Sequence, residues 1–179
     1  DVVLVASNGK VVRFKESKVR VMGRTARGVR GMRVAEGEEV IALIVPEADG
    51  QLLTASKNGY GKRTDLSAFP TKGRGTQGVI GMVVNERNGE LVGAAQVVGG
   101  EDIMLISNQG TLVRTRVDEV SHLGRNTQGV RLIRMSGDEA LSGLATIPEL
   151  EGDLLDDEAL EHDAGEDDSE SAPDTDQDQ

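Results

Sequence analysis

Three observations predict an all-β, propeller-like fold made of four-stranded blades. The loop Gly-Arg-x-x-x-Gly-Val occurs three times, and its copies start 50 and 51 residues apart, at 23–29, 73–79 and 124–130. A glycine and an arginine precede each copy at fixed spacing: Gly9 and Arg13, Gly59 and Arg63, Gly110 and Arg114. Val, Ile and Thr dominate the apolar runs, and no segment before Leu150 keeps the apolar spacing of a helix. Repetition with this period is typical of propellers and repeat arrays.

The first repeat, residues 1–50, is predicted to begin with a hairpin. Asn8-Gly9 stands between the β-rich runs 2–7 and 10–14, and Asn-Gly in this position is a strong hairpin signal. After the Gly-Arg loop we expect a third strand at 29–34 and, beyond a polar turn, a fourth at 40–45. Four strands in one repeat are the content of a propeller blade.

The second repeat, residues 51–102, and the third, residues 103–148, have the same order of elements. Their hairpin turns are predicted at Asn58-Gly59 and at 108–110. Third strands are expected at 79–84 and 130–135, and fourth strands at 91–98 and 140–147. With only three aromatic residues in the chain, the core must be aliphatic. The Trp-Asp signature of WD-repeat propellers has no counterpart.

Residues 149–179 are predicted to form a disordered acidic C-terminal tail. They hold fifteen Asp and Glu and no Lys or Arg, and such a segment cannot bury enough apolar surface to offset the entropy of ordering. The whole chain has a formal charge of −11. Residues 1–148, however, carry 20 basic and 16 acidic side chains, a net of +4. The folded part is therefore mildly basic.

Several kinds of chemistry are not expected. The chain has no cysteine for disulfides or thiolate sites, and no apolar run approaches a membrane span. Its two histidines, His122 and His162, have no third group placed with them, so we predict no catalytic residue, no metal site and no cofactor. Residues 73–78 fit G-x-G-x-x-G, but a β-branched segment follows where a dinucleotide site needs a helix. The last glycine of each loop (Gly28, Gly78, Gly129) is expected instead to allow positive φ or a close backbone approach where the chain enters the third strand.

Basic residues concentrate around the Gly-Arg loops. Residues 10–33 hold nine basic side chains and one acidic, whereas residues 35–51 hold five acidic and none basic. Stacked repeats bring equivalent segments to one rim, which predicts a basic band. The repeated arginines could bind either phosphate or loop carbonyls, so the basic residues that differ between repeats are the better phosphate candidates. The predicted DNA-binding residues are Lys10, Arg13, Lys15, Lys18, Arg20, Arg24, Arg27, Arg30, Lys57, Lys62, Arg63, Lys72, Arg74, Arg114, Arg116, Arg125 and Arg131.

The composition favours duplex DNA over single strands. The chain offers no aromatic stacking platform and no helix for the major groove, so binding to the phosphate backbone without sequence preference is expected.

Four strings of residues, 11–15, 59–64, 111–116 and 124–130, resemble the C-terminal domain of the A subunit of bacterial DNA gyrase. The resemblance covers residues 1 to about 148. It implies a β-pinwheel, a propeller-like ring of six repeats whose blades exchange strands and whose basic perimeter wraps duplex DNA. This chain looks like the last three blades plus the acidic tail. Because Asp1 starts inside an expected strand, we expect a piece of a longer chain.

The resemblance also implies the surroundings of this piece. The longer protein would support ATP-dependent negative supercoiling in the bacterial cytoplasm, at the nucleoid. Its partners would be the gyrase B subunit and a second A subunit, with ATP and Mg²⁺ bound by other domains. Two features of the family are absent from this chain: the glutamine-arginine-glycine-lysine box and the DNA-cleaving tyrosine, whose motif Tyr60 does not match.

Other hypotheses remain open from the sequence. The related domain of topoisomerase IV uses the same repeat, and a propeller-like module could instead bind an acidic protein. The tail either competes with DNA for the basic rim or only increases solubility. A partial ring of three repeats exposes strand edges, which predicts low stability or aggregation.

Overall fold

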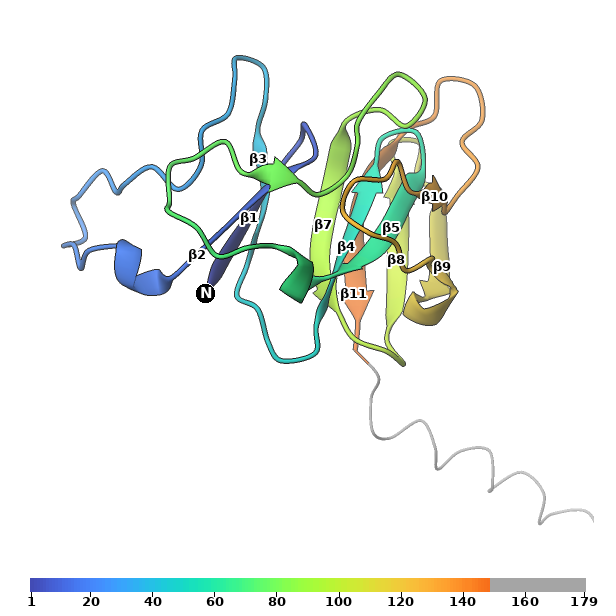
Figure 1. Ribbon diagram of the computed structural model, residues 1–179. Helices are drawn as coiled ribbons and strands as arrows, with labels where there is room; N and C mark the ends of the chain where they lie inside the picture. The colour runs from blue at the N-terminus through green and yellow to red at the C-terminus, as the bar shows by residue number, and fades with distance from the viewer. Residues whose placement is uncertain (149–179) are drawn as a thin grey trace, which may run out of the picture. The chain divides into compact units, whose positions relative to one another are not determined.

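The computed structural model describes residues 1–148 of the 179-residue chain (Figure 1). The predicted tail lies outside the described residues. Within them the regular structure consists of eleven strands and three 3-10 helices, with no α-helix, which confirms the all-β prediction. None of the described helices is long and apolar enough to cross a membrane.

Each repeat begins with the predicted antiparallel hairpin. The inner strands are β1 (Val2–Ala6), β4 (Gln51–Ser56) and β8 (Asp102–Ser107), and their hairpin partners are β2 (Lys10–Phe14), β5 (Tyr60–Asp65) and β9 (Leu112–Arg116). The turn glycines Gly9, Gly59 and Gly110 have φ near +80°, at 81°, 80° and 86°. A 3-10 helix follows each hairpin: η1 (Glu16–Lys18), η2 (Leu66–Ala68) and η3 (Val117–Glu119).

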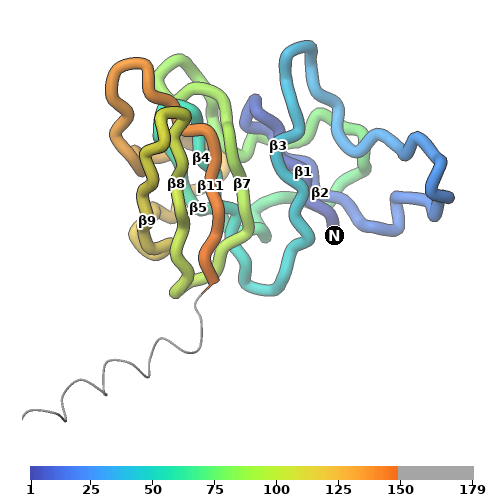
Figure 2. Tube along the Cα trace, turned by 180° about the vertical axis from the view of Figure 1, so that it is seen from behind, coloured from blue at the N-terminus to red at the C-terminus, as the bar shows by residue number. Residues whose placement is uncertain are grey.

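The predicted fourth strands are also present. These are β3 (Val40–Ile44), β7 (Leu91–Val97) and β11 (Leu141–Ile147), and each pairs with the first strand of its own repeat. Strands β7 and β11 lie side by side, as do β3 and β7 (Figures 1 and 2). The fourth strands therefore bring successive repeats into contact.

The predicted third strands are much shorter than expected and belong to a neighbouring sheet. In repeat 2 only β6 (Val79–Ile80) forms, and it pairs with β2 of repeat 1. In repeat 3 only β10 (Val130–Arg131) forms, and it pairs with β5 of repeat 2. The expected strand at 29–34 is absent apart from an isolated bridge at Met32, because no earlier hairpin among the described residues offers it an edge.

This exchange makes two four-stranded sheets, β3-β1-β2-β6 and β10-β5-β4-β7, and one three-stranded sheet, β11-β8-β9. Each complete sheet thus contains three strands of one repeat and one of the next. Strand exchange was implied by the family resemblance. The repeat boundaries read from the sequence do not coincide with the edges of the sheets.

The core lies between successive repeats. Side chains alternate along each strand, so that Val3 and Val5 face repeat 2 while Leu4 and Ala6 face the opposite way. Repeat 1 packs on repeat 2 through Val3, Val5, Val11, Leu52, Leu66 and Phe69. Repeat 2 packs on repeat 3 through Leu53, Ala55, Ile103, Leu105, Val117 and Val120. The core is largely aliphatic, as the composition predicts.

Glycines make the strand exchange possible. Gly78 and Gly129, which precede the exchanged strands, have φ of 80° and 74°, which confirms the expected positive values. A Cβ at Gly78 would overlap the carbonyl of Val11, and one at Gly129 would lie 2.7 Å from the carbonyl oxygen of Gly61. Gly28 also has positive φ, 82°, but its Cβ would meet nothing within 4 Å.

Candidate nucleic-acid interface

The predicted DNA-binding residues fall into three groups by exposure. Lys62 is buried. Half-buried are Lys10, Arg13, Arg63, Arg74 and Arg125. Exposed are Lys15, Lys18, Arg20, Arg24, Arg27, Arg30, Lys57, Lys72, Arg114, Arg116 and Arg131. The positions that repeat as arginine are thus mostly withdrawn from solvent where a neighbouring repeat is present.

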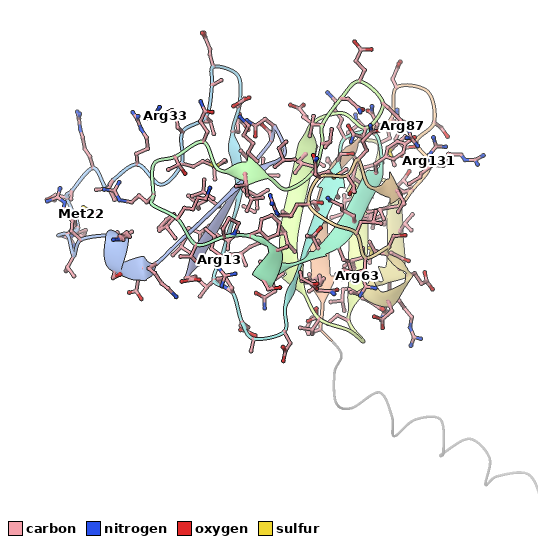
Figure 3. The ribbon with its side chains drawn as sticks, in the orientation of Figure 1. Arg13, Met22, Arg33, Arg63, Arg87 and Arg131 are labelled. Atoms are coloured by element: carbon pink, nitrogen blue, oxygen red, sulfur yellow. The ribbon has the colours of Figure 1, made fainter. Side chains whose placement is uncertain are left out.

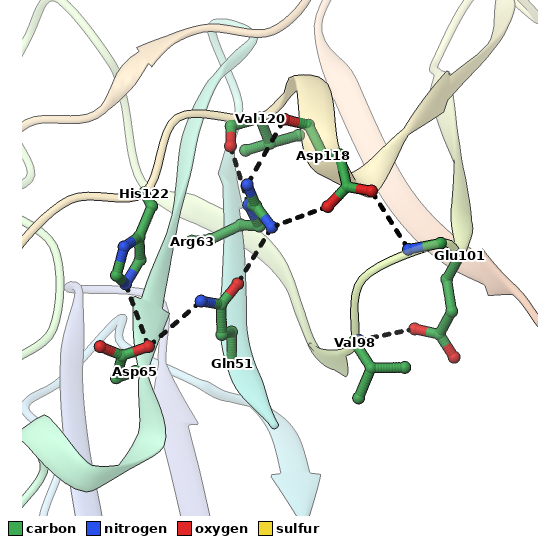
Figure 4. Close-up of polar contacts among 9 residues, drawn as sticks. Gln51, Arg63, Asp65, Val98, Glu101, Asp118, Val120 and His122 are labelled. Atoms are coloured by element: carbon green, nitrogen blue, oxygen red, sulfur yellow. Dashed lines mark hydrogen bonds and ion pairs between the residues drawn. The ribbon is translucent and has the colours of Figure 1, made fainter. Parts of the chain in front are cut away.

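Arg13 and Arg63 each reach across to the following repeat. Nη1 of Arg13 donates to the carbonyl of Leu66 in η2 at 2.7 Å. Nε of Arg63 donates to the carbonyl of Val120, directly after η3, at 2.8 Å, and its side chain also contacts Gln51 (Figure 4). These guanidiniums join the outer strand of one repeat to the 3-10 helix of the next.

Arg114 stands at the same position in repeat 3, where no later repeat is described. Its side chain is 61% exposed and pairs with Asp102, at the start of its hairpin partner β8, at 2.6 Å. Arginine at this position of the repeat therefore links two repeats in Arg13 and Arg63, and lies on the surface in Arg114.

Arginines of the Gly-Arg loops reach in the opposite direction. Arg74 donates to the carbonyls of Arg30 at 2.7 Å and Lys18 at 3.0 Å, both in repeat 1. Arg125 donates to the carbonyl of Ile80 in repeat 2 at 3.0 Å. The sequence left open whether these arginines bind phosphate or backbone carbonyls, and the contacts seen here are with backbone carbonyls. They also place Arg74 beside the basic segment of repeat 1.

The structure corrects the expectation for Lys62. Its Nζ donates to the carbonyls of Gly124 and Arg125, both at 2.6 Å, and to Oγ1 of Thr127 at 2.9 Å. Burial, together with the nearby charge of Arg125, lowers the pKa of Lys62 to about 8. The ammonium group is therefore committed to the Gly-Arg loop of repeat 3 and is not placed for phosphate.

A sequence signal for this burial exists. The equivalent positions in the other repeats are Val12 and Val113, so the position is apolar in two repeats of three. Variation between repeats is therefore not by itself a sign of surface exposure.

Arg87 and Arg131 lie close together (Figure 3). Both guanidinium groups contact the ring of Tyr60. Arg131 donates to the Tyr60 hydroxyl at 2.7 Å and Arg87 at 3.4 Å. Their guanidinium carbons lie 5.3 and 4.9 Å from the ring centroid. Hydrogen bonds from Arg131 and then Arg87 lower the pKa of Tyr60. One buried tyrosine thus holds two exposed guanidiniums from different repeats close together.

The sequence predicted Arg131 but missed Arg87, and it also missed the exposed Arg33 and Arg134. Arg33 and Arg134 occupy equivalent positions after the Gly-Arg loops, which was an available signal. Arg87 lies in a turn outside the basic segments and becomes apparent only when β10 is placed beside β5. Among residues 1–148 no group of His, Cys, Asp or Glu is arranged to hold a metal.

The sequence model described as DNA gyrase C-terminal domain, beta-propeller, matches residues 1–47, 50–97 and 101–148. The DNA gyrase A subunit of Pseudomonas aeruginosa is 58% identical over 178 residues, which cover 97% of this chain and 19% of that protein. The Escherichia coli K12 protein of the same name is 53% identical over 180 residues, 99% of this chain and 20% of that protein. The chain spans about a fifth of the length of these relatives.

Solved structures agree. A structure of the DNA gyrase A C-terminal domain has a TM-score of 0.76 and 26% identity, covering 82% of this chain and 50% of that chain. The C-terminal domain of DNA topoisomerase IV also has a TM-score of 0.76, at 22% identity over 82% of this chain and 46% of that chain. The latter likeness concerns the fold alone.

Proposed function

This chain belongs to the DNA gyrase C-terminal domain family, and we propose on that basis that residues 1–148 bind duplex DNA through its phosphate backbone. The exposed lysines and arginines of the loops neutralise phosphates, and contact along several repeats favours a bent DNA path. The bases are not read. In the longer protein this binding supplies wrapped DNA for ATP-dependent negative supercoiling.

The proposal rests on one observation: the variable basic side chains are mostly exposed, whereas the repeated arginines between described repeats and the aromatic rings are occupied inside the fold. Basic residues that differ between repeats are mostly exposed, whereas the repeated arginines between described repeats bind backbone carbonyls. All three aromatic side chains are buried, with exposures of 3% for Phe14, 5% for Tyr60 and 2% for Phe69. Single-stranded DNA is usually held by stacking on exposed rings. This surface instead offers positive charge, which suits a duplex backbone.

Arg87 and Arg131 are the best-defined candidates for contact with DNA phosphates. Two guanidiniums held by one tyrosine have little rotational freedom left before DNA arrives, so binding costs less entropy. Guanidiniums fork onto phosphate oxygens in a way that ammonium groups do not.

A salt titration tests the proposal. Binding of the 179-residue chain to two duplexes of unrelated sequence should weaken linearly on a log–log plot against salt, with equal slopes. Replacing Arg87 and Arg131 by alanine should weaken both complexes equally and reduce the slope by about 0.9 for each phosphate that is no longer neutralised. Affinity that is insensitive to salt, or that differs strongly between the duplexes, would contradict the proposal.

The matched control is the double variant Arg87→Lys and Arg131→Lys. It keeps both charges, so the salt slope should stay near that of the parent chain while some affinity disappears with the forked geometry. An acidic protein that binds the chain more tightly than duplex DNA at equal salt would favour the protein-interaction alternative.

The remaining parts of the proposal concern the longer protein. Because the chain spans a fifth of relatives that are DNA gyrase A subunits, we propose the gyrase B subunit and a second A subunit as its partners. ATP and Mg²⁺ would be bound by other parts, and the site of action would be the bacterial cytoplasm, at the nucleoid. Co-purification of the gyrase B subunit with the longer protein is the corresponding test.

A further inference from the structure

Arg87 and Arg131 belong to different repeats and meet on the same side chain. Both guanidiniums donate to the hydroxyl oxygen of Tyr60, at 3.4 and 2.7 Å. Both also lie over its ring, with their central carbons 4.9 and 5.3 Å from the centroid. Two guanidiniums whose donors reach one oxygen atom are close enough for a single tetrahedral anion to accept hydrogen bonds from both.

Among residues 1–148 this pair of cations has no carboxylate partner. Arg13, Arg63 and Arg114 each make an ion pair within that part of the chain, but Arg87 and Arg131 make none. Like charges held on one side chain repel each other. An anion bound between them would relieve this repulsion, so the arrangement favours an anionic ligand.

The backbone that presents Arg87 is held by asparagine side chains. Oδ1 of Asn85 accepts from the N–H of Arg87 at 3.0 Å. Nδ2 of Asn58, in the hairpin turn of repeat 2, donates to the carbonyls of Glu86 and Arg87 at 3.2 and 3.1 Å. The turn at residues 85–89 is therefore fixed before any ligand binds.

Asn88 joins this turn to the loop that leads to Arg131. Asn88 is fully buried, and its Nδ2 donates to the carbonyls of Val83 at 2.7 Å and Gln128 at 3.1 Å. Its Oδ1 accepts from the N–H of Asn85 at 2.8 Å. Gln128 lies three residues before Arg131, in the Gly-Arg loop of repeat 3. One amide group thus fixes both of the segments that carry the two guanidiniums.

The junction between repeats 1 and 2 has an equivalent backbone but different side chains. Its exchanged strand β6 has Ile80 where β10 has Arg131. Its turn has Gly37 where repeat 2 has Arg87, and a lysine replaces the tyrosine. Of these two junctions, only that between repeats 2 and 3 therefore carries the paired guanidiniums.

The residue that joins turn and loop differs in the same way. Asn88 and Glu38 occupy the same position of the turn, and each accepts from the backbone N–H three residues earlier, at 2.8 Å: Asn88 from Asn85 and Glu38 from Ala35. A carboxylate has no N–H to donate, so only the amide can bond the Gln128 carbonyl of the following repeat. The joining amide thus occurs at the junction that has the two arginines.

We propose that Arg87 and Arg131 bind one and the same phosphate group, and that Asn88 is the positioning residue that sets the spacing of the two guanidiniums. The ligand is a tetrahedral phosphate, either one phosphodiester of the DNA backbone or a free phosphate ion. The DNA source rests on the function proposed above, whereas the free ion does not. Tyr60 holds both guanidiniums in place until the phosphate accepts from them.

Tyr60 provides a direct measurement, because the chain has one tyrosine and no tryptophan. Inorganic phosphate added to the 179-residue chain at constant ionic strength should change tyrosine emission saturably, since guanidiniums that turn to the phosphate leave the hydroxyl. A short DNA duplex should cause the same change at lower concentration. The control is the double variant Arg87→Ala and Arg131→Ala, which should show neither change.

The emission titration separates the two sources of phosphate. Saturation with inorganic phosphate but no change with duplex would support the site, assign it to the free ion and remove it from the DNA contact. A change that does not saturate with either ligand, or that persists in the double alanine variant, overturns the proposal.

The salt dependence of DNA binding counts the phosphates. If the two arginines share one phosphate, the double alanine variant should lower the slope of log affinity against log salt by about 0.9. Two separate phosphates would lower it by about 1.8, and that result overturns the shared site. Affinity that does not depend on salt would instead contradict the proposed DNA binding, and the titration with inorganic phosphate would then decide the site.

Asn88→Leu tests the positioning role at similar side-chain volume. DNA affinity should fall by about two- to tenfold, because a loosened guanidinium must be ordered when it binds. In the Arg87→Ala and Arg131→Ala chain the same substitution should leave affinity unchanged, since it acts only through these two side chains. Equal losses in both chains would show a purely structural role and overturn the assignment of Asn88.

Circular dichroism checks that each variant is folded. Should Asn88→Leu lack the native spectrum, Asn88→Glu replaces it, because repeat 1 has Glu38 at this position of its turn. The added charge weakens DNA binding in every chain, so the expected result is a greater loss in the parent than in the double alanine variant. Equal losses again overturn the positioning role.

Discussion

At the scale of single residues, the role of an arginine depends on whether a following repeat packs beside it. Arg63 and Arg114 occupy the same position of the repeat, yet Arg63 has a side chain that is 14% exposed and Arg114 one that is 61% exposed. One guanidinium satisfies the Val120 carbonyl of the next repeat, and the other makes an exposed ion pair. The sequence alone could not distinguish them.

This pair yields a direct prediction. Arg63→Ala should lower the free energy of unfolding by about 2 to 3 kcal/mol, because removal of a charged donor leaves the Val120 carbonyl without its partner. Arg114→Ala, the matched control, should cost about 0 to 1 kcal/mol, since exposed ion pairs contribute little. Urea unfolding with unchanged slope measures both. Equal losses would argue against the role of Arg63 as a link between repeats.

Lys62 gives a second prediction. Lys62→Met fills similar space but removes the donor from the Gly124 and Arg125 carbonyls and from Thr127. We expect a loss of about 1 to 3 kcal/mol in the free energy of unfolding. Lys57→Met, at an exposed lysine of the same repeat, should change stability by no more than about 0.5 kcal/mol. A Lys62→Met chain as stable as its parent would show that the loop needs no ammonium group.

The pH dependence of stability follows from the same residue. The pKa of Lys62 is about 8 in the folded chain and about 10.4 in an unfolded one. Between these values the unfolded state binds more protons, so stability must rise with pH through this window. Relative to Lys62→Met, the parent chain should therefore gain stability as pH increases above about 8. A difference that stays constant from pH 7 to about 10.4 would contradict the lowered pKa.

At the scale of elements, the sequence predicted the hairpins and fourth strands well because their signals are local. Asn8-Gly9 and Asn58-Gly59 mark turns, and the β-rich runs beside them lie on strands as expected. The third strands could not be placed in this way. Their partners are β2 and β5, which lie in the preceding repeat, and a period in the sequence does not say which repeat supplies the edge.

The candidate site follows the same pattern: features set by local sequence were recognised, and those set by contact with another repeat were not. Basic segments were recognised from composition, and most of their lysines and arginines are exposed, while their binding to DNA stays a prediction. Lys62 was misjudged because burial depends on the loop of another repeat. Arg87 was missed because its companion Arg131 is brought to Tyr60 only by strand exchange.

The loops that lead into the exchanged strands make a further prediction. Gly28 and Gly78 share a positive φ, of 82° and 80°, so an alanine at either costs about 1 to 2 kcal/mol of backbone strain. At Gly78 the added methyl group also overlaps the Val11 carbonyl. Gly78→Ala should therefore destabilise the chain by at least about 1 kcal/mol more than Gly28→Ala. Similar melting temperatures for the two variants would show that β6 does not depend on this close approach.

At the scale of the whole molecule, charge is divided between two parts of the chain. Residues 1–148 carry a net +4, and the whole chain carries −11 because of the fifteen acidic residues beyond them. A tethered polyanion has a high effective concentration at a basic surface. We therefore expect the acidic segment to compete with DNA for the same lysines and arginines.

Deleting residues 149–179 tests this competition. DNA affinity should rise at low salt, and the gain should shrink as salt screens the charges. A chain with a scrambled acidic segment of the same composition should regain the weaker binding. Unchanged affinity at low salt after the deletion would leave the segment a role in solubility only.

The strand exchange between repeats also bears on how such an array can grow. A repeat added after β11 would place its exchanged strand beside β9, complete the open sheet of repeat 3 and present an identical open edge of its own. The existing sheets would not have to change, because the outer strand of each hairpin pairs with a strand from the following repeat. Gene duplication could thus lengthen the array one repeat at a time, with selection acting on the new loops while the inherited interface assembles unaltered.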